Sequence, residues 1–119
     1  MKPRKPADDA PSAIDGLWPA PWVRAALEPA ILGALVSGPL HGYGIAQALA
    51  DQGFGRLRGG SLYPVLGRLE EQKLVTATWA PGQSGPGRKD YALTPRGRQT
   101  YEDALSSWRR LGDALAARS

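Results

Sequence analysis

The sequence predicts a mainly α-helical protein with one small β-hairpin, an α+β fold. Two observations lead to this prediction. Apolar residues recur at helical spacing in four separate segments, and between the third and fourth segments the pattern changes to β-branched and aromatic residues. The chain has 119 residues, which is enough for one small domain.

Two helices are expected first, at residues 22–37 and 43–51. The apolar side of the first consists of Leu27, Ile31, Leu32 and Leu35. Pro29 should kink this helix or mark a restart, because proline removes a helical hydrogen bond. The stretch "GPLHG" at 38–42 is predicted as a turn, and the glycine-rich residues 52–60 as a connector.

The third helix is expected at residues 61–73, with Ser61 as its N-cap and Pro64 in its first turn. Its buried stripe consists of Leu62, Val65, Leu66 and Leu69. The opposite face carries little bulk and consists of Ser61, Tyr63, Pro64, Gly67 and Arg68. With the positive pole of the helix dipole at its start, this face suits a flat anionic partner; an ordinary solvated face is the alternative.

After this helix, residues 75–80 and 88–94 are expected to form a hairpin around the loop 81–87. Thr94 and Pro95 then predict a capped helix start. The last helix should run to about residue 118, with a stripe at coiled-coil spacing made of Tyr101, Leu105, Trp108, Leu111 and Leu115. Because little of the domain remains to cover this stripe, a second copy of the chain is the expected partner.

Three helices followed by a hairpin is the winged helix-turn-helix arrangement, here with one C-terminal dimerisation helix. The DNA-binding domain is expected at 22–94 and the dimerisation helix at 95–119. Residues 1–21 are expected to be a disordered proline-rich tail, because they are rich in Pro, Asp and Lys. The end of this tail contains Trp18. Trp18 and Trp22 are large aromatic residues, and both are expected to dock on another surface.

The charge distribution favours an anionic partner. The formal net charge is +4, and residues 41–100 hold eight Lys/Arg against four Asp/Glu. There is no cysteine, which excludes disulfides and thiol chemistry. Without an apolar run long enough to span a bilayer, or a signal-peptide pattern at the start, a soluble cytoplasmic protein is expected.

Catalysis is not expected. His41 is the one histidine and falls in the predicted turn, where nothing supports a nucleophile–base pair. The sequence lacks a cysteine–histidine metal set, and its glycine-rich stretches match neither a phosphate-binding loop nor a dinucleotide fingerprint. We therefore expect no enzyme activity, no metal and no cofactor.

Three stretches resemble the PadR family of bacterial transcriptional regulators: "LEPAILGALVSGPLHGYGIAQAL" (27–49), "GSLYPVLGRLEEQKLV" (60–75) and "GRKDYALTPRGR" (87–98). The resemblance covers residues 22–118 and implies a homodimeric repressor that binds a palindromic operator. The implied DNA contacts are Tyr43, Ser61, Leu62, Tyr63, Arg68, Arg88 and Lys89.

Each of these contacts has an ordinary structural alternative. Tyr63 can be a plain surface tyrosine, Tyr43 a core residue, and Ser61 only a cap. Arg68 can pair with the neighbouring Glu70 and Glu71, and the two wing cations can simply aid solubility.

The single helix after the hairpin resembles the short PadR subfamily. Some of its members bind planar aromatic drugs at the dimer centre, between tryptophans of the last helix. This resemblance implies a ligand site formed by Trp22, Ala26, Pro29 and Trp108. Trp108 can alternatively do no more than pack at the dimer seam. Pro29 and the "WPAPW" lead-in depart from the family pattern and are expected to reshape the cavity.

Two other functions fit the sequence. A small-molecule-sequestering resistance protein would bind aromatic compounds but have little role at DNA. A protein-interaction module would use the tryptophan-containing tail.

Overall fold

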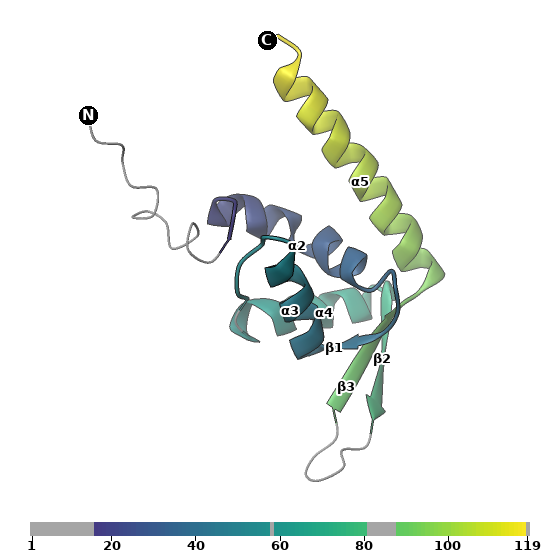
Figure 1. Ribbon diagram of the computed structural model, residues 1–119. Coiled ribbons are helices and arrows are strands. Elements are labelled where there is room, and N and C mark those ends of the chain that lie inside the picture. Colours follow the sequence, from purple (N-terminus) through teal and green to yellow (C-terminus); the bar gives the residue numbers. More distant parts are fainter. Residues whose placement is uncertain (1–15, 58, 81–87, 119) are drawn as a thin grey trace, which may run out of the picture.

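Four helices and a three-stranded antiparallel sheet form the part of the chain that the computed structural model describes, residues 16–57, 59–80 and 88–118. Figure 1 shows their arrangement. In chain order they are α2 (Ala20–Ala34), β1 (Leu40–His41), α3 (Gly42–Asp51), α4 (Gly59–Glu71), β2 (Val75–Ala80), β3 (Arg88–Leu93) and α5 (Pro95–Ala116). The predicted α+β, winged helix-turn-helix class with one helix after the wing is confirmed.

The core lies between the first three helices and the base of the hairpin. It consists of the predicted stripes, and its most deeply buried side chains are Ile31, Leu32, Leu35, Ile45, Leu49, Leu66, Leu69 and Val75. Each such side chain stabilises the fold by about 1.5–3 kcal/mol through burial. Because the leucines of α4 are buried in this core, the other face of the helix is exposed to solvent.

The sheet contains a strand that the sequence did not predict. β1 pairs with β3 through Leu40↔Tyr91 and His41↔Asp90, where a simple turn was expected at 38–42. A strand of two residues is too short to show the alternating pattern by which strands are predicted. It forms only because β3 lies beside it. β2 and β3 form the predicted hairpin, in register from Val75↔Leu93 to Ala80↔Arg88. The predicted loop 81–87 lies outside the described residues.

Helix α4 begins earlier than predicted. It starts at Gly59, so Ser61 lies in its first turn and is not its N-cap. Pro64 therefore lies inside the helix, beyond the first turn, where its missing N–H removes the bond to the carbonyl of Gly60. Ser61 is a favourable cap residue, but the helix extends through the two glycines before it.

The end of α4 is a Schellman motif with a lysine in the left-handed position. Lys73 has φ 63°. The Leu74 N–H donates to the Leu69 carbonyl at 2.9 Å, and the Lys73 N–H donates to the Glu70 carbonyl at 3.0 Å. Leu69 and Leu74 are both buried, which supplies the apolar contact typical of this motif. The motif turns the chain directly into β2.

Helix α2 begins before the predicted domain boundary. It runs from Ala20 to Ala34 and continues through Pro29, so the predicted restart does not occur. Residues 16–19, here called the N-terminal strap, already pack on the domain. The Leu17 N–H donates to the Gly53 carbonyl at 2.7 Å, and the Trp18 ring lies 5.3 Å from the Phe54 ring, between centroids. The docking predicted for Trp18 is confirmed, whereas Trp22 is 62% exposed. The described part of the domain includes the strap from residue 16.

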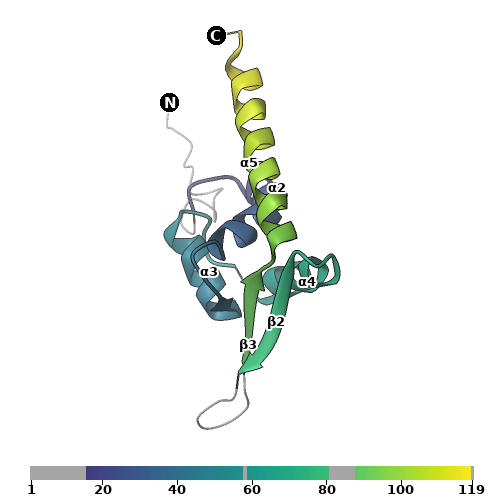
Figure 2. The ribbon, with the colours of Figure 1, turned by 90° about the vertical axis from the view of Figure 1, so that its right-hand side faces the viewer.

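Helix α5 starts as predicted and then leaves the body of the molecule. The Thr94 hydroxyl accepts a hydrogen bond from the Gly97 N–H at 2.9 Å. Tyr101 packs against Gly33 of α2, where an added Cβ would lie 2.8 Å from the tyrosine Cε1. Beyond this contact the helix extends away from the other elements, as the two views in Figures 1 and 2 agree. None of the helices in the described residues is long and apolar enough to cross a membrane.

Candidate functional site

The face of α4 opposite the core is open to solvent. Ser61, Tyr63, Pro64, Gly67 and Arg68 are all exposed, as the helical spacing predicted. Tyr63 is the largest of them and is 52% exposed.

Leu62 was included among the DNA contacts, and the structure corrects this. It is 2% exposed and belongs to the hydrophobic core. Its side chain packs in the core, so it supports the exposed face without forming part of it.

A groove of about 520 Å³ lies where the start of α3, the exposed face of α4 and the hairpin meet. We call it the wing groove. It brings together four predicted DNA contacts from separate parts of the chain: Tyr43, Tyr63, Arg88 and Lys89. The other residues that line it are His41, Gly42, Gly67, Glu70, Trp79 and Tyr91.

Two tyrosines are positioned at one end of the wing groove. The Tyr63 ring lies against Gly42 at the first residue of α3, where an added Cβ would be 2.7 Å from the tyrosine Cζ. A glycine is therefore needed at this position for Tyr63 to lie where it does. Tyr43 is 70% exposed and stacks on His41, with ring centroids 6.2 Å apart. The alternative that Tyr43 is a core residue is thus wrong.

The cations around the wing groove are paired with carboxylates. Lys89 Nζ lies 3.5 Å from Glu70, and Arg88 Nε lies 3.4 Å from Asp90. Arg68 Nη2 lies 3.2 Å from Glu28 of α2, so its ion-pair partner is neither of the neighbouring glutamates on its own helix.

These are partly exposed pairs, each worth about 0–1 kcal/mol. A phosphate can therefore compete for these cations at small cost.

The floor of the wing groove is apolar. Tyr91 is 4% exposed, and burial raises the pKa of its phenol above the ordinary value. Trp79 stands at the edge of the groove and is 67% exposed. Sequence reasoning assigned Trp79 to a strand but gave it no function. Its position opposite Lys89 indicates a role at this groove, but that position is known only once the register of the hairpin is known.

A second region, between α2, α5 and residues 52–54, is hollow and apolar. One hollow of about 240 Å³ is lined by Trp18, Trp22, Val23, Ala26, Phe54 and Trp108. The adjoining hollow of about 230 Å³ is lined by Ala26, Pro29, Ala30, Gly33, Gln52, Phe54, Tyr101, Leu105 and Trp108. The four residues predicted for a ligand site, Trp22, Ala26, Pro29 and Trp108, thus each line one or both of these adjoining hollows. Trp18 and Phe54 were not predicted there, because their meeting depends on the strap.

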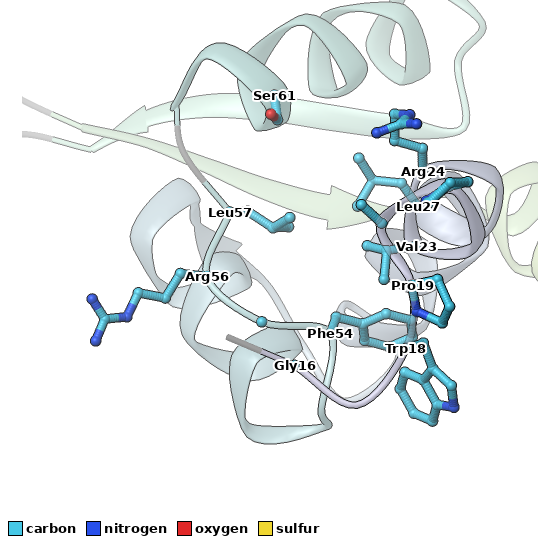
Figure 3. A pocket seen from close by; sticks show the side chains of 13 residues that line it. Gly16, Trp18, Pro19, Val23, Arg24, Leu27, Phe54, Arg56, Leu57 and Ser61 are labelled. Carbon is cyan, nitrogen blue, oxygen red and sulfur yellow. The ribbon is translucent and has the colours of Figure 1, made fainter. Parts of the chain in front are cut away.

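A third hollow, of about 540 Å³, lies between the strap, the first turns of α2 and the connector to α4. Figure 3 shows Trp18 and Phe54 together at one end, Leu57 in the middle and Ser61 near the other end, while Arg56 points away. Phe54 lines all three of these hollows. It is therefore placed between the apolar region and the residues that lead into α4.

The apolar stripe on α5 is largely uncovered. Trp108 is 39%, Leu111 48% and Leu115 80% exposed. Tyr101 differs from the other predicted dimer residues, because it packs on Gly33 of its own chain and belongs to the fold of one protomer. Leu105 is partly buried beside it. The stripe that remains available to a partner begins at Trp108.

Comparison with known proteins identifies the family. Residues 31–103 match the transcriptional regulator PadR-like family, which is more than half of the chain. The chain belongs to the PadR-like family. Members of this family are transcriptional regulators and not enzymes, in agreement with the expectation that this protein is not a catalyst.

Solved PadR-family structures share the fold over most of this chain. A regulator from Eggerthella lenta is 30% identical, with a TM-score of 0.74, covering 82% of this chain and 84% of that one. A Bacillus cereus PadR-like regulator is 29% identical, with a TM-score of 0.71, covering 82% and 94%. Bacillus subtilis PadR, solved in complex with operator DNA, is 31% identical, with a TM-score of 0.61, covering 67% and 45%.

One relative known from its sequence is a 37.1 kDa protein in transposon TN4556 of Streptomyces fradiae. It is 42% identical over 81 residues, or 68% of this chain. The chain spans 22% of that relative's length.

Proposed function

We propose that this PadR-like protein is a homodimeric, sequence-specific DNA-binding repressor that recognises a palindromic operator. The observation that carries the proposal is the wing groove, which gathers Tyr43, Tyr63, Arg88 and Lys89 beside the exposed face of α4. In a winged helix-turn-helix protein this face enters the major groove and the hairpin reaches the flanking backbone. The relative that was solved with operator DNA supports the same use of the fold.

The residues divide into two roles at DNA. Tyr63 is proposed to contact base edges, with Ser61, two residues earlier on α4, as a second candidate, while Arg88 and Lys89 would face phosphates. Arg68 lies at the side of α4 nearest α2 and would exchange Glu28 for a phosphate. If six to ten phosphate contacts form per dimer, affinity falls about 10³–10⁵-fold between roughly 50 and 200 mM salt.

The dimer is proposed to form along α5. The stripe of Trp108, Leu111 and Leu115 is exposed on a helix that extends from the body, and a second copy is its proposed cover. Two-fold symmetry then presents two α4 helices to successive major grooves, about 34–36 Å apart. That separation depends on how the two α5 helices cross.

We further propose that a planar aromatic molecule regulates this dimer. Trp22, Ala26, Pro29 and Trp108 line apolar hollows that adjoin the α5 stripe, so a ligand there would contact both protomers. Phe54 lines the same hollows and lies two residues before Arg56 on the connector to α4. The ligand alters operator affinity only if it binds the DNA-competent arrangement and the free arrangement with different affinity.

A mobility-shift assay on the DNA upstream of the gene tests the DNA role. Wild-type protein should shift this DNA, and Tyr63→Ala should weaken the shift by at least tenfold, about the cost of one good base contact. Gln72→Ala is the matched control, because Gln72 is exposed just after the same helix but does not line the wing groove. Equal affinity of Tyr63→Ala and wild type would refute the assignment of the recognition face.

The same assay with added aromatic compounds tests the ligand role. An effector should change the shift and quench tryptophan fluorescence, and Trp108→Ala should abolish the quenching. A compound that quenches strongly with no operator shift at any concentration would favour the sequestration function instead. Quenching that persists in Trp108→Ala would place the ligand elsewhere.

A further inference from the structure

Trp79 occupies a position in the hairpin that the fold does not explain. In the register of β2 and β3 it lies opposite Lys89, as Ala77 lies opposite Tyr91. Residues two apart on a strand share a face, so Trp79 is on the face that carries the buried Tyr91 and looks toward α4. Yet the indole is 67% exposed and does not belong to the core cluster.

The surroundings of Trp79 are charged rather than apolar. Lys89 Nζ lies 5.8 Å from the centroid of the indole and 3.5 Å from Glu70 of α4. Arg88 lines the same groove, and among its described lining residues Glu70 is the one acid. A large flat aromatic flanked by cations, and left open to solvent, is suited to an anionic partner that also offers an apolar surface.

We propose that Trp79 is a DNA-contacting residue that anchors the wing on the sugar–phosphate backbone. This inference rests on the proposed DNA-binding function. The flat indole would cover a deoxyribose, and its Nε1–H would donate to an adjacent phosphate, since tryptophan offers a donor and no acceptor. Such a contact holds the wing in position but reads no base sequence.

An uncharged backbone contact has a distinctive salt signature. Losing a phosphate-bound lysine lowers the slope of log affinity against log salt by about 0.9 per site, so by about 1.8 for both chains of a dimer. A variant without Trp79 still releases as many counterions as wild type when it binds DNA. Its affinity should therefore fall by the same factor at every salt concentration. Specific and mixed-sequence DNA should be affected alike.

The experiment is a salt series of binding titrations with an operator duplex and a mixed-sequence duplex. We expect Trp79→Ala to weaken binding to both by about thirtyfold, the lower end of the cost of losing an aromatic contact to nucleic acid in each of the two chains, with the wild-type slope retained. Lys89→Gln should instead reduce the slope. Thr78→Ala is the matched control, because Thr78 is the neighbouring exposed residue on the other face of β2.

A conservative variant keeps the test decisive if Trp79→Ala fails to fold. Trp79→Phe retains the aromatic face and loses the donor, so it should bind with intermediate affinity. DNA should quench the fluorescence of wild type more than that of Trp79→Phe, because the tryptophans at 18, 22 and 108 lie away from the wing groove.

Four results would overturn the proposal. Unchanged affinity in folded Trp79→Ala or identical quenching in Trp79→Phe would leave Trp79 with a structural role only, while the DNA-binding function stands. An altered salt slope in Trp79→Ala would show that the indole acts through Lys89. If wild type binds neither duplex at low salt, the DNA-binding function fails and this inference fails with it.

Discussion

The proposed dimer makes a quantitative prediction for the free part of α5. Leu111 is 48% exposed and Leu115 is 80% exposed. Complete burial of a leucine side chain gives a free energy of about 2 kcal/mol. Covering the exposed fraction therefore gives about 1 kcal/mol for Leu111 and about 1.6 kcal/mol for Leu115. A two-fold interface uses each residue twice, for a total of about 5 kcal/mol. Replacing both with glutamine should therefore weaken dimerisation about 10³–10⁴-fold.

Sedimentation across a range of concentrations measures this effect directly, because the protomer is 12.7 kDa. The matched control is Arg110→Gln with Asp113→Gln, which introduces the same residues on the other side of α5 with no change in net charge. Circular dichroism confirms that both double variants keep their helices. A wild-type protein that sediments as a monomer at micromolar concentration, or a leucine variant that dimerises as tightly as the control, would refute the reasoning.

Three further predictions follow from single contacts. Lys73→Gly should raise the free energy of unfolding, measured by urea titration, by roughly 0.5–1 kcal/mol, because glycine adopts the left-handed backbone without the penalty of a side chain. Gly42→Ala should weaken operator binding about as much as Tyr63→Ala, since the new methyl displaces the tyrosine ring. Glu70→Gln should tighten binding to all DNA severalfold in a mobility-shift assay, whereas Glu71→Gln, outside the wing groove, should change it less.

Periodicity predicted the helices and the hairpin because these elements are amphipathic over several turns or residues. Leu62, Val65, Leu66 and Leu69 are buried together, as their spacing required. The same spacing left Tyr63 exposed, so the face proposed for recognition followed from the sequence. Thr94 was recognisable as a cap because its interaction with Gly97 is local.

Features that depend on distant segments were not predictable. The strand β1 exists because β3 lies beside it, and the order of the strap depends on Gly53 and Phe54, more than thirty residues further along the chain. The wrong cap at Ser61 has a different cause. Two glycines score poorly as helix formers, yet here they continue α4 toward its N-terminus.

The pairing of the cations has a consequence for how tightly this protein would bind DNA of any sequence. Arg68, Arg88 and Lys89 each lie within 3.5 Å of a carboxylate, so a phosphate gains only the difference between two weak surface interactions. Neutralised cations lower non-specific affinity, which is almost entirely electrostatic. Specific affinity also includes uncharged contacts such as that of Tyr63, and these are unaffected by the pairing. Because phosphate contacts contribute to operator and non-specific binding alike, the ion pairs at this surface should lower both affinities by a similar factor and leave discrimination to the uncharged contacts.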